Sequence, residues 1–333
     1  MKFSWSSRYA HRKLFSPVPL FDPAAGQTII EPPGSGPGWW AGAPSAFYDE
    51  ERERFYLYYR LRKPLELGRG GTCCVAESRD GREFQTIWSA QKEEFASLSI
   101  EKATLIKTPE GRYRLYVSYV NRFDDRWYID LLEAENPGDF DTGTRRTVLS
   151  PEETQTEGVK DPVVIHAGGL YYLYANFAPL LPDGGTPEAR NKMHAAANAF
   201  VSGVVNTGTG LAVSRDGIRF RWEGEVLSPG TGWDAFMARL SSLLYIPPFF
   251  LAFYDGRPNV AHSYEDMVGL AVTTDLRHFT KVSVDRPLLS SRHATGALRY
   301  PEVVAFPDRL FFYYEYARPD GSHELRLNVV ELE

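Results

Sequence analysis

Alternating apolar and polar positions recur along the chain as one repeated pattern. Each copy opens with an apolar stretch, passes through a short polar turn, and ends in an aromatic stretch with Leu or Tyr at its centre. Short runs rich in aromatic and β-branched residues, bounded by turn residues, are typical of β-hairpins. The five predicted hairpins occupy residues 44–60, 103–119, 161–177, 239–255 and 300–316.

The spacing of these hairpins indicates a repeat architecture. The central residues are Leu57, Leu115, Leu173, Leu251 and Tyr313, at intervals of 58, 58, 78 and 62 residues. A recurring period of this kind is the sequence signature of stacked structural units. Four of the hairpins precede a second predicted strand pair, and in three of these pairs the turn contains Asp-Gly or Pro-Gly. These pairs occupy residues 73–90, 130–150, 211–228 and 270–290.

Four strands in each of five units predict an all-β fold, a five-bladed β-propeller with four-stranded blades. The prediction is a single domain over residues 1–333, with helical periodicity confined to residues 187–200. The last unit ends after three strands, and residues 12–18 resemble the outer strands of other units, so we expect them to close the ring. The predicted blades cover residues 41–90, 101–150, 160–228, 234–290, and 298–333 plus 12–18.

Composition narrows the class of protein. With 43% hydrophobic and 24% charged residues, the chain can bury a sizeable core, which excludes disorder. The formal net charge of −6 provides no basic footprint for nucleic acid. The longest strongly apolar run, Leu243–Tyr254, is interrupted by Pro247-Pro248, so no membrane span is expected.

The N-terminal residues and the two cysteines indicate in which cellular compartment the protein works. The first residues carry charges but no apolar signal core, which predicts a cytoplasmic protein. Cys73 and Cys74 are adjacent and would point to opposite faces of a strand. Neither a disulfide framework nor a cysteine zinc site is therefore expected.

The loops differ between the two ends of the predicted propeller. At the end where the first strand of each unit begins, the loops are long and rich in Arg, Asp, His and Trp, whereas the other end has tight turns. The segment 179–210 accounts for the long interval, and loops of this length commonly form lids or binding loops. We expect it to fold over the channel mouth and to shape one wall of a pocket.

Aligning the five first strands places one residue from each near a common level of the axis. These residues are Ala43, Glu101, Asp161, Arg239 and Tyr300, and Glu302 follows two residues beyond the last of them. Converging carboxylates repel, so one can hold a proton while another stays charged, as acid–base chemistry on a glycosidic bond requires. The alternative is that each carboxylate only neutralises an arginine, Arg239 or Arg299.

Several short motifs resemble the five-bladed glycoside hydrolases, families 43, 32, 68, 117 and 130, over the whole chain. The resemblance implies a propeller fold and activity on glycosidic bonds. The motifs are the residue-plus-Pro openings Ala43-Pro44, Asp161-Pro162 and Tyr300-Pro301, the sequence GLYYLYANF, and YDGR (254–257) followed by GLAVTTDLRHF (269–279).

The resemblance to families 43 and 32 carries over in part. Their third-blade Asp matches Asp161, whereas their first-blade carboxylate corresponds to Ala43. Their fourth-blade acid is a Glu, but here Arg239 occupies that level and Asp234 is the nearest carboxylate. Asp161, Glu101 and Asp234 are therefore the catalytic candidates.

The resemblance to family 130 is also incomplete. In that family an Asp follows a second-blade Glu, but here Lys102 follows Glu101. Arg60 is similar to the first-blade Arg that faces the substrate there. These departures count against a standard inverting hydrolase mechanism.

Other residues of this end are candidates for sugar binding. Tryptophans stack on sugar rings in wet clefts, or they fill gaps between blades. His194, His262 and His293 show no ligand spacing, so we expect neither a metal nor a cofactor. The substrate-binding candidates are Trp39, Trp40, Arg60, Arg239, Asp255, Arg257, His262, Arg299 and Glu302.

The sequence therefore predicts a carbohydrate-active enzyme, glycoside hydrolase-like, with a small-molecule carbohydrate as its partner. A non-catalytic sugar-binding propeller is an alternative, because the first-blade carboxylate is missing. A family-130-like glycoside phosphorylase is another, because the loops of the site end are rich in arginine. Neither nucleic acid nor a membrane is expected as a partner.

Overall fold

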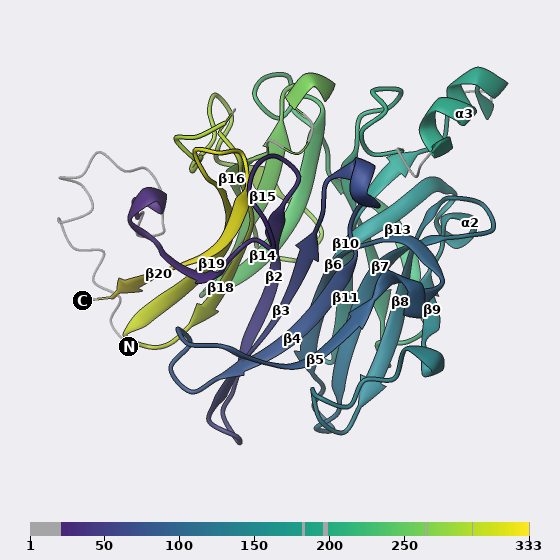
Figure 1. The fold of residues 1–333 in the computed structure, drawn as a ribbon. Helices are drawn as coiled ribbons and strands as arrows, with labels where there is room; N and C mark the ends of the chain where they lie inside the picture. Colours follow the sequence, from purple (N-terminus) through teal and green to yellow (C-terminus); the bar gives the residue numbers. More distant parts are fainter. Residues whose placement is uncertain are drawn as a thin grey trace.

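The strands form groups of four that follow one another along the chain (Figure 1). The computed structural model describes residues 21–181, 184–195, 199–262, 264, 266–294 and 296–332. The first group is β2 (Trp40–Asp49), β3 (Arg54–Arg62), β4 (Thr72–Ser78) and β5 (Gln85–Gln91). The second is β6 (Ser97–Lys107), β7 (Tyr113–Asn121), β8 (Trp127–Ala134) and β9 (Arg146–Leu149).

The later groups repeat this order of antiparallel strands. The third is β10 (Thr156–Ala167), β11 (Leu170–Pro179), β12 (Gly208–Ser214) and β13 (Arg221–Leu227). The fourth is β14 (Met237–Ile246), β15 (Phe249–Arg257), β16 (Met267–Thr273) and β17 (Thr280–Lys281). The last contains β18 (Leu298–Ala305), β19 (Arg309–Ala317) and β20 (His323–Glu331). The all-β class and the four-stranded sheets are thus confirmed.

The N-terminal part of the described chain completes the last group. Strand β1 (Gln27–Ile30) pairs antiparallel with β20, with Gln27 opposite Leu327. Residues 12–18, predicted for this role, lie outside the described residues. A single parallel pair, Trp40 with His323, joins β2 to β20 and links the first and last groups into one eight-stranded sheet.

The first strands of the groups contact one another in a closed circle. Strand β2 contacts β6, β6 contacts β10, β10 contacts β14, β14 contacts β18, and β18 contacts β2. Hydrophobic clusters fill the spaces between successive groups; Tyr58 and Leu115 meet in one, and Tyr313 and Leu57 in another. Because each cluster draws on two groups, no group has a complete core alone. The five repeat positions are fully buried: Leu57, Leu115, Leu173, Leu251 and Tyr313.

Helices are short and few among the described residues. The helix expected within 187–200 is α3 (Pro187–His194), which begins where the Thr186 side chain accepts a hydrogen bond from the Ala189 N–H. A single turn that the periodicity missed, α2 (Pro151–Thr154), is capped by Ser150. No helix in these ranges is long and apolar enough to cross a membrane.

Short 3₁₀ turns lie in the connections, and their bounds are as follows. They are η1 (Pro23–Ala25), η2 (Leu65–Leu67), η3 (Lys92–Phe95), η4 (Thr142–Thr144) and η7 (Val260–His262).

Both cysteines are free and buried. Cys73 and Cys74 belong to different hydrophobic clusters, so they do point to opposite faces of β4.

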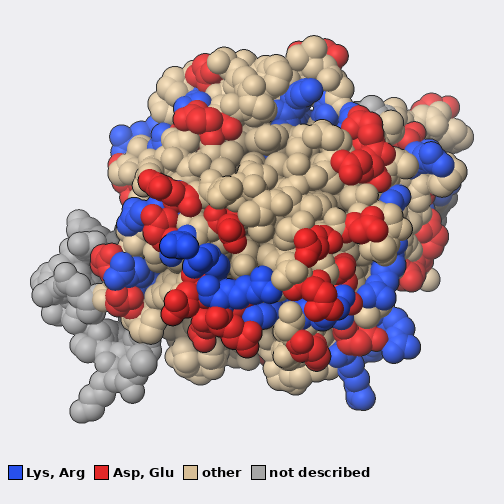
Figure 2. Space-filling view, turned by 60° about the horizontal axis from the view of Figure 1, so that its bottom comes forward, with Lys and Arg blue, Asp and Glu red and all other residues tan. Residues whose placement is uncertain are grey.

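The two ends of the strands differ as the loop lengths predict. Tight hairpins such as β2–β3 lie at the bottom of Figure 1, whereas α3 and η7 lie at the top. On the surface shown in Figure 2, where the bottom comes forward, basic and acidic residues are interspersed without a broad patch of one sign. That surface therefore offers no continuous basic path for a nucleic acid.

Gly42 on β2 provides a test of the packing between the first and last groups. A Cβ at this position would overlap the carboxylate of Glu315 on β19. We expect Gly42→Ala to lower the free energy of unfolding by about 1–3 kcal/mol, because the buried Glu315 has no room to move. Urea unfolding followed by fluorescence measures the loss.

Gly71 is the matched control for this substitution. A Cβ on Gly71 would meet no atom closer than 3.9 Å, the carbonyl oxygen of Arg69. Gly71→Ala should therefore change the stability by less than about 1 kcal/mol. Equal stability of the two variants would contradict the close packing of Glu315 against β2.

Candidate active site at one end of the strand axis

An irregularity in each first strand places the candidate residues at the centre of the circle. The pairing register shifts after Gly42, Ile100, Lys160, Leu240 and Arg299, which marks a β-bulge at a corresponding place in all five strands. Bulges bend a strand and redirect a side chain. The predicted level is therefore correct for four strands, while in β14 the bulge follows Leu240 and Arg239 precedes it.

Three bulges share an unusual backbone conformation. Ala43, Asp161 and Tyr300 have φ values of 55°, 54° and 54°, and each precedes a proline. Left-handed backbone costs a non-glycine residue roughly 1–2 kcal/mol. The surrounding sheet must offset this cost, and the conformation serves to aim the side chain of Asp161 and of Tyr300 inward.

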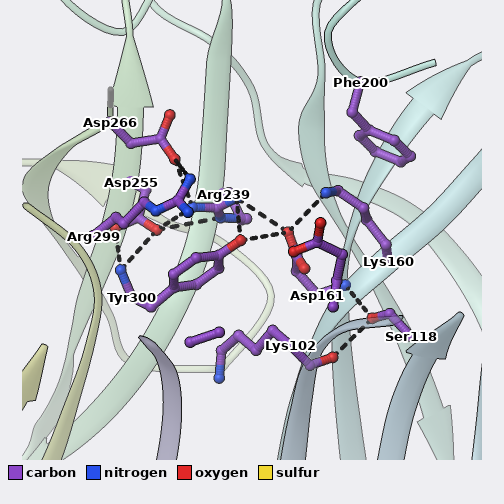
Figure 3. Close-up of polar contacts among 12 residues, drawn as sticks. Lys102, Ser118, Lys160, Asp161, Phe200, Arg239, Asp255, Asp266, Arg299 and Tyr300 are labelled. Carbon is purple, nitrogen blue, oxygen red and sulfur yellow. Dashed lines mark hydrogen bonds and ion pairs between the residues drawn. The ribbon is translucent and has the colours of Figure 1, made fainter. Parts of the chain in front are cut away.

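Arg239 is the centre of the polar network (Figure 3). Its guanidinium lies 3.1 Å from Asp161, 2.5 Å from Asp255 and 2.8 Å from Asp266. It also donates a 3.0 Å hydrogen bond to the Tyr300 hydroxyl and lies over the Tyr300 ring. All these side chains are buried, so one arginine compensates carboxylates from three different segments of the chain.

Asp255 and Asp266 form ion pairs with the same Arg239 nitrogen and hold the guanidinium in place. Asp255 also accepts hydrogen bonds from the Ser241 hydroxyl and from the Tyr300 N–H. Burial raises the pKa of Asp255 to about 6, and the nearby Asp266 carboxylate adds to this shift.

Glu101 is held by arginines of the neighbouring first group. It forms an ion pair with Arg60, and Arg62 lies 3.8 Å from its other oxygen. Glu101 is 3% exposed, and its backbone carbonyl accepts a hydrogen bond from Tyr58. Arg60, expected to face the substrate, is fully buried in this ion pair and does not itself line the cavity described below.

Glu315 brings a carboxylate to the place where Ala43 lacks one. The Ala43 N–H donates a 3.2 Å hydrogen bond to Glu315, which comes from β19 rather than from a first strand. Arg299 and His323 each lie 2.7 Å from its other oxygen. Burial alone would raise the pKa of Glu315, but Arg299 and His323 hold it far below the ordinary value.

Lys102 and Glu302 form a separate pair beyond the bulges. The Lys102 ammonium lies 4.0 Å from Glu302 and donates a hydrogen bond to the Pro44 carbonyl. Burial raises the pKa of Glu302 to about 7 and lowers the pKa of Lys102. Glu302 does not line the cavity described next, so the structure places it apart from the other candidates.

A small cavity lies at the loop end of the axis. Its volume is about 20 Å³, which is room for roughly one water molecule. Phe200 and Val201 line it, and the Arg257 guanidinium donates a 2.8 Å hydrogen bond to the Phe200 carbonyl. Two residues of the predicted wall segment 179–210 therefore contribute to the cavity lining. The other lining residues are Arg62, Glu101, Lys160, Asn176, Met237, Arg239, Arg257, Tyr264, Asp266, Arg299 and Tyr300.

Lys160 joins this cavity to Asp161. Its ammonium lies 3.6 Å from Asp161 and 5.0 Å from the centre of the Phe200 ring. Burial lowers the pKa of Lys160 to about 7, although Asp161 opposes the shift. Burial alone would raise the pKa of Asp161, but Lys160 and Arg239 hold it below the ordinary value. Asp161 is thus kept ionised at neutral pH.

The tryptophan candidates have different positions. The Trp40 ring stacks on His323 at 4.6 Å, and Arg62 and Arg299 lie over it at 4.3 and 4.7 Å. Trp40 is 5% exposed, so it fills a gap between groups and offers no open face to a sugar. Trp39 packs beside Gly34 and does not line the cavity.

Asp234 and His262 also lie apart from the cavity. Asp234 accepts hydrogen bonds from Lys281 at 2.5 Å and Tyr254 at 3.1 Å. His262 bonds to the Asn259 side chain in a loop. Of the candidates, Glu101, Arg239, Arg257 and Arg299 line the cavity, and Asp161, Asp255 and Arg60 form ion pairs with lining residues, whereas neither Asp234 nor His262 lines it.

The three histidines considered for a metal are dispersed. His194 lies 2.8 Å from Glu157, and His293 packs edge-on against Tyr316. Among the described residues, no group of three or more His, Cys, Asp or Glu could hold a metal ion.

Several residues of the site were missed by the sequence reasoning. Asn176 and Glu315 each interrupt an aromatic strand with a polar side chain, which is a usable signal for a buried polar site. Lys160 directly precedes the Asp161-Pro162 pair. Asp266 and Tyr264 lie in a loop, where nothing in the local pattern marks them.

Comparisons with known proteins identify the fold. No family model matches the chain, and no curated protein matches it in sequence. Solved structures do match, including a glycosyl hydrolase from Bacteroides ovatus, with a TM-score of 0.60, 14% identity, and coverage of 91% of this chain and 88% of that one.

Two further structures extend the comparison. A thermostable family-43 glycoside hydrolase has a TM-score of 0.62, 16% identity, and coverage of 92% and 93%. The β-1,2-mannobiose phosphorylase from Listeria innocua has a TM-score of 0.59, 13% identity, and coverage of 91% and 92%. The fold is therefore that of the glycoside hydrolases of families 43, 130 and related groups, as the sequence resemblance implied.

The position of Arg239 generates a stability prediction. Arg239→Met leaves Asp161, Asp255 and Asp266 without their shared cation, so we expect a loss of about 3–5 kcal/mol at pH 7.5. In the native protein the pKa values of Asp161 and Asp266 are lowered, so their stabilising effect is present at neutral pH. Without the arginine these pKa values rise, and the deficit should shrink as the pH falls toward 5.

Arg221→Met is the matched control. Arg221 is 80% exposed and pairs with Glu223 on the surface, so its loss should cost less than about 1 kcal/mol at either pH. Thermal unfolding at pH 7.5 and pH 5 measures both variants. A deficit for Arg239→Met that stays constant with pH would exclude its role in compensating the carboxylates.

Proposed function

We propose that the chain is a single five-bladed propeller domain over residues 1–333 that acts on a glycosidic bond as a carbohydrate-active enzyme. The observation that carries this proposal is the placement of two carboxylates from consecutive groups at the loop end of the axis: Glu101 lines the cavity, and Asp161 lies beside Lys160 and Arg239, which also line it. The similarity to glycoside hydrolase structures supports the same assignment.

The two carboxylates take different parts in the proposed reaction. Asp161 stays ionised because Lys160 and Arg239 lie beside it, so it stabilises positive charge on the sugar or activates water. Glu101, which lines the cavity, is assigned the proton transfer to the leaving oxygen; this requires that bound substrate loosen its ion pair with Arg60, so that the carboxyl can take up a proton first. Arg60 and Arg239 position these two side chains.

Substrate access requires movement of the cavity wall. A space of about 20 Å³ admits one small group but no sugar ring. Phe200 and Val201 belong to the long connection between β11 and β12, which can yield without breaking the sheet. The ring is therefore expected to bind where these two residues now lie.

A non-catalytic sugar-binding role is the second candidate, and one observation favours it. Ala43 occupies the first-strand position, and the nearby Glu315 is held by Arg299 and His323. A panel of aryl glycosides and oligosaccharides, incubated with and without inorganic phosphate, separates the possibilities. Product without phosphate supports hydrolysis, product only with phosphate indicates a phosphorylase, and binding without product indicates a sugar-binding protein.

Amide substitutions test the two carboxylates. Asp161→Asn and Glu101→Gln keep the shape and remove the charge, so turnover per folded molecule should fall by about 10²–10⁴. Steady-state rates on the best substrate of the panel, corrected for the folded fraction, provide the measurement.

Asp234→Asn is the matched control, since Asp234 is equally buried but bonded to Lys281 and Tyr254. It should lower the melting temperature and leave the rate per folded molecule within about twofold of wild type, well short of an acid–base loss. The assignment is wrong if Asp161→Asn and Asp234→Asn have the same rate.

A further inference from the structure

We propose that the axial cavity binds the carboxylate of an acidic carbohydrate, so that the ligand is a uronic acid or contains one. This inference rests on the proposed action on carbohydrate and names the class of sugar. It follows from unpartnered polar atoms in the cavity wall, from the charge of that wall, and from the size of the space.

Asn176 is the first observation. It lies on β11 and is 1% exposed, yet neither atom of its side-chain amide has a hydrogen-bond partner within the described chain. A buried polar group without a partner costs about 1–3 kcal/mol. Because Asn176 lines the cavity, a bound group there would satisfy its amide.

Arg62 and Arg257 are the second observation. They are 2% and 3% exposed, and the Nε–H of each has no partner within the described residues. Their other contacts, Arg62 with Glu101 and Arg257 with Asp266, keep both side chains fixed. Donors with a fixed position in a buried wall are suited to an oxyanion.

The charge of the wall favours an anion. Five cations and two carboxylates line the cavity. Asp161 and Asp255 approach Arg239 from outside the lining and compensate two of the cations. Arg60, paired with Glu101, and Glu315, paired with Arg299, lie outside the lining and add one charge of each sign. The wall with these partners keeps an excess of positive charge, to which Arg69 near Tyr264 adds, and the carboxylate of a ligand would offset part of this excess.

The size of the space agrees with a carboxylate. The space as it stands has room for about one carboxylate oxygen, and the rest of the sugar would lie where Phe200 and Val201 now are. A neutral sugar has no group that would use the donors of Arg62, Arg257 and Lys160 together. The cavity therefore selects for the acid.

Calorimetric titration of the full chain tests the proposal. The probes are D-glucuronate, D-galacturonate, D-glucose, D-galactose, acetate and inorganic phosphate. We expect at least one uronate to bind about tenfold or more tightly than its neutral counterpart, because charge-assisted hydrogen bonds are roughly twice as strong as neutral ones.

Two variants keep the test independent of folding defects. Asn176→Asp preserves the shape and adds a negative charge, which the excess cation compensates, so the chain should fold while uronate affinity falls about tenfold or more. Lys160→Met keeps the aliphatic stem beside Phe200, removes the charge, and should weaken the same affinity. Asn191→Asp, an exposed position on α3, is the matched control and should bind as wild type.

The outcomes separate this inference from the proposed function. Equal affinity for uronates and neutral sugars, or unchanged uronate affinity in folded Asn176→Asp, overturns it. Phosphate that binds more tightly than either uronate also overturns it and favours phosphorolysis. Uronate binding lost in Asn176→Asp supports the inference even when no glycoside is cleaved, since it needs no turnover.

Discussion

The compensation of buried carboxylates by Arg239 is the interaction on which the centre of the molecule depends. Asp161, Asp255 and Asp266 come from separate segments and would repel one another without it. Buried charges are tolerated only when they are paired and hydrogen-bonded. The hydrophobic clusters hold neighbouring groups together, but the arginine fixes how their first strands meet. Fold and candidate site therefore share one electrostatic centre.

Much of the architecture could be predicted because it rests on periodic burial. Leu57 and its four counterparts fall at the centres of aromatic strands, and the sheets bury all of them. The position of the axial residues followed from the residue-plus-Pro openings, since Asp161 and Tyr300 lie at bulges with the same φ. Strand β1, which pairs with β20, was harder to predict, because Gln27–Ile30 is a short segment that does not resemble the repeated units.

The candidate site was less predictable, because long side chains cross between strands. Aligning the strand sequences placed Arg239 at the level of Asp161. In β14, however, the bulge that corresponds to the one at Asp161 lies two residues after Arg239. The contact between Arg239 and Asp161 therefore depends on the length of the arginine side chain. Asp234 is close to Arg239 in sequence, yet its side chain bonds to Lys281. Asp266 is brought in by a loop, whose path no local pattern specifies.

The placement of Glu315 beside Ala43 makes these two positions epistatic. A carboxylate introduced at Ala43 would lie close to the carboxylate of Glu315. Arg299, which now compensates the single charge of Glu315, could not compensate both. Gly42, which has no room for a side chain, further restricts this strand. A sequence with an acid on the first strand would therefore have to lose the β19 acid, so the two arrangements are related by a paired exchange.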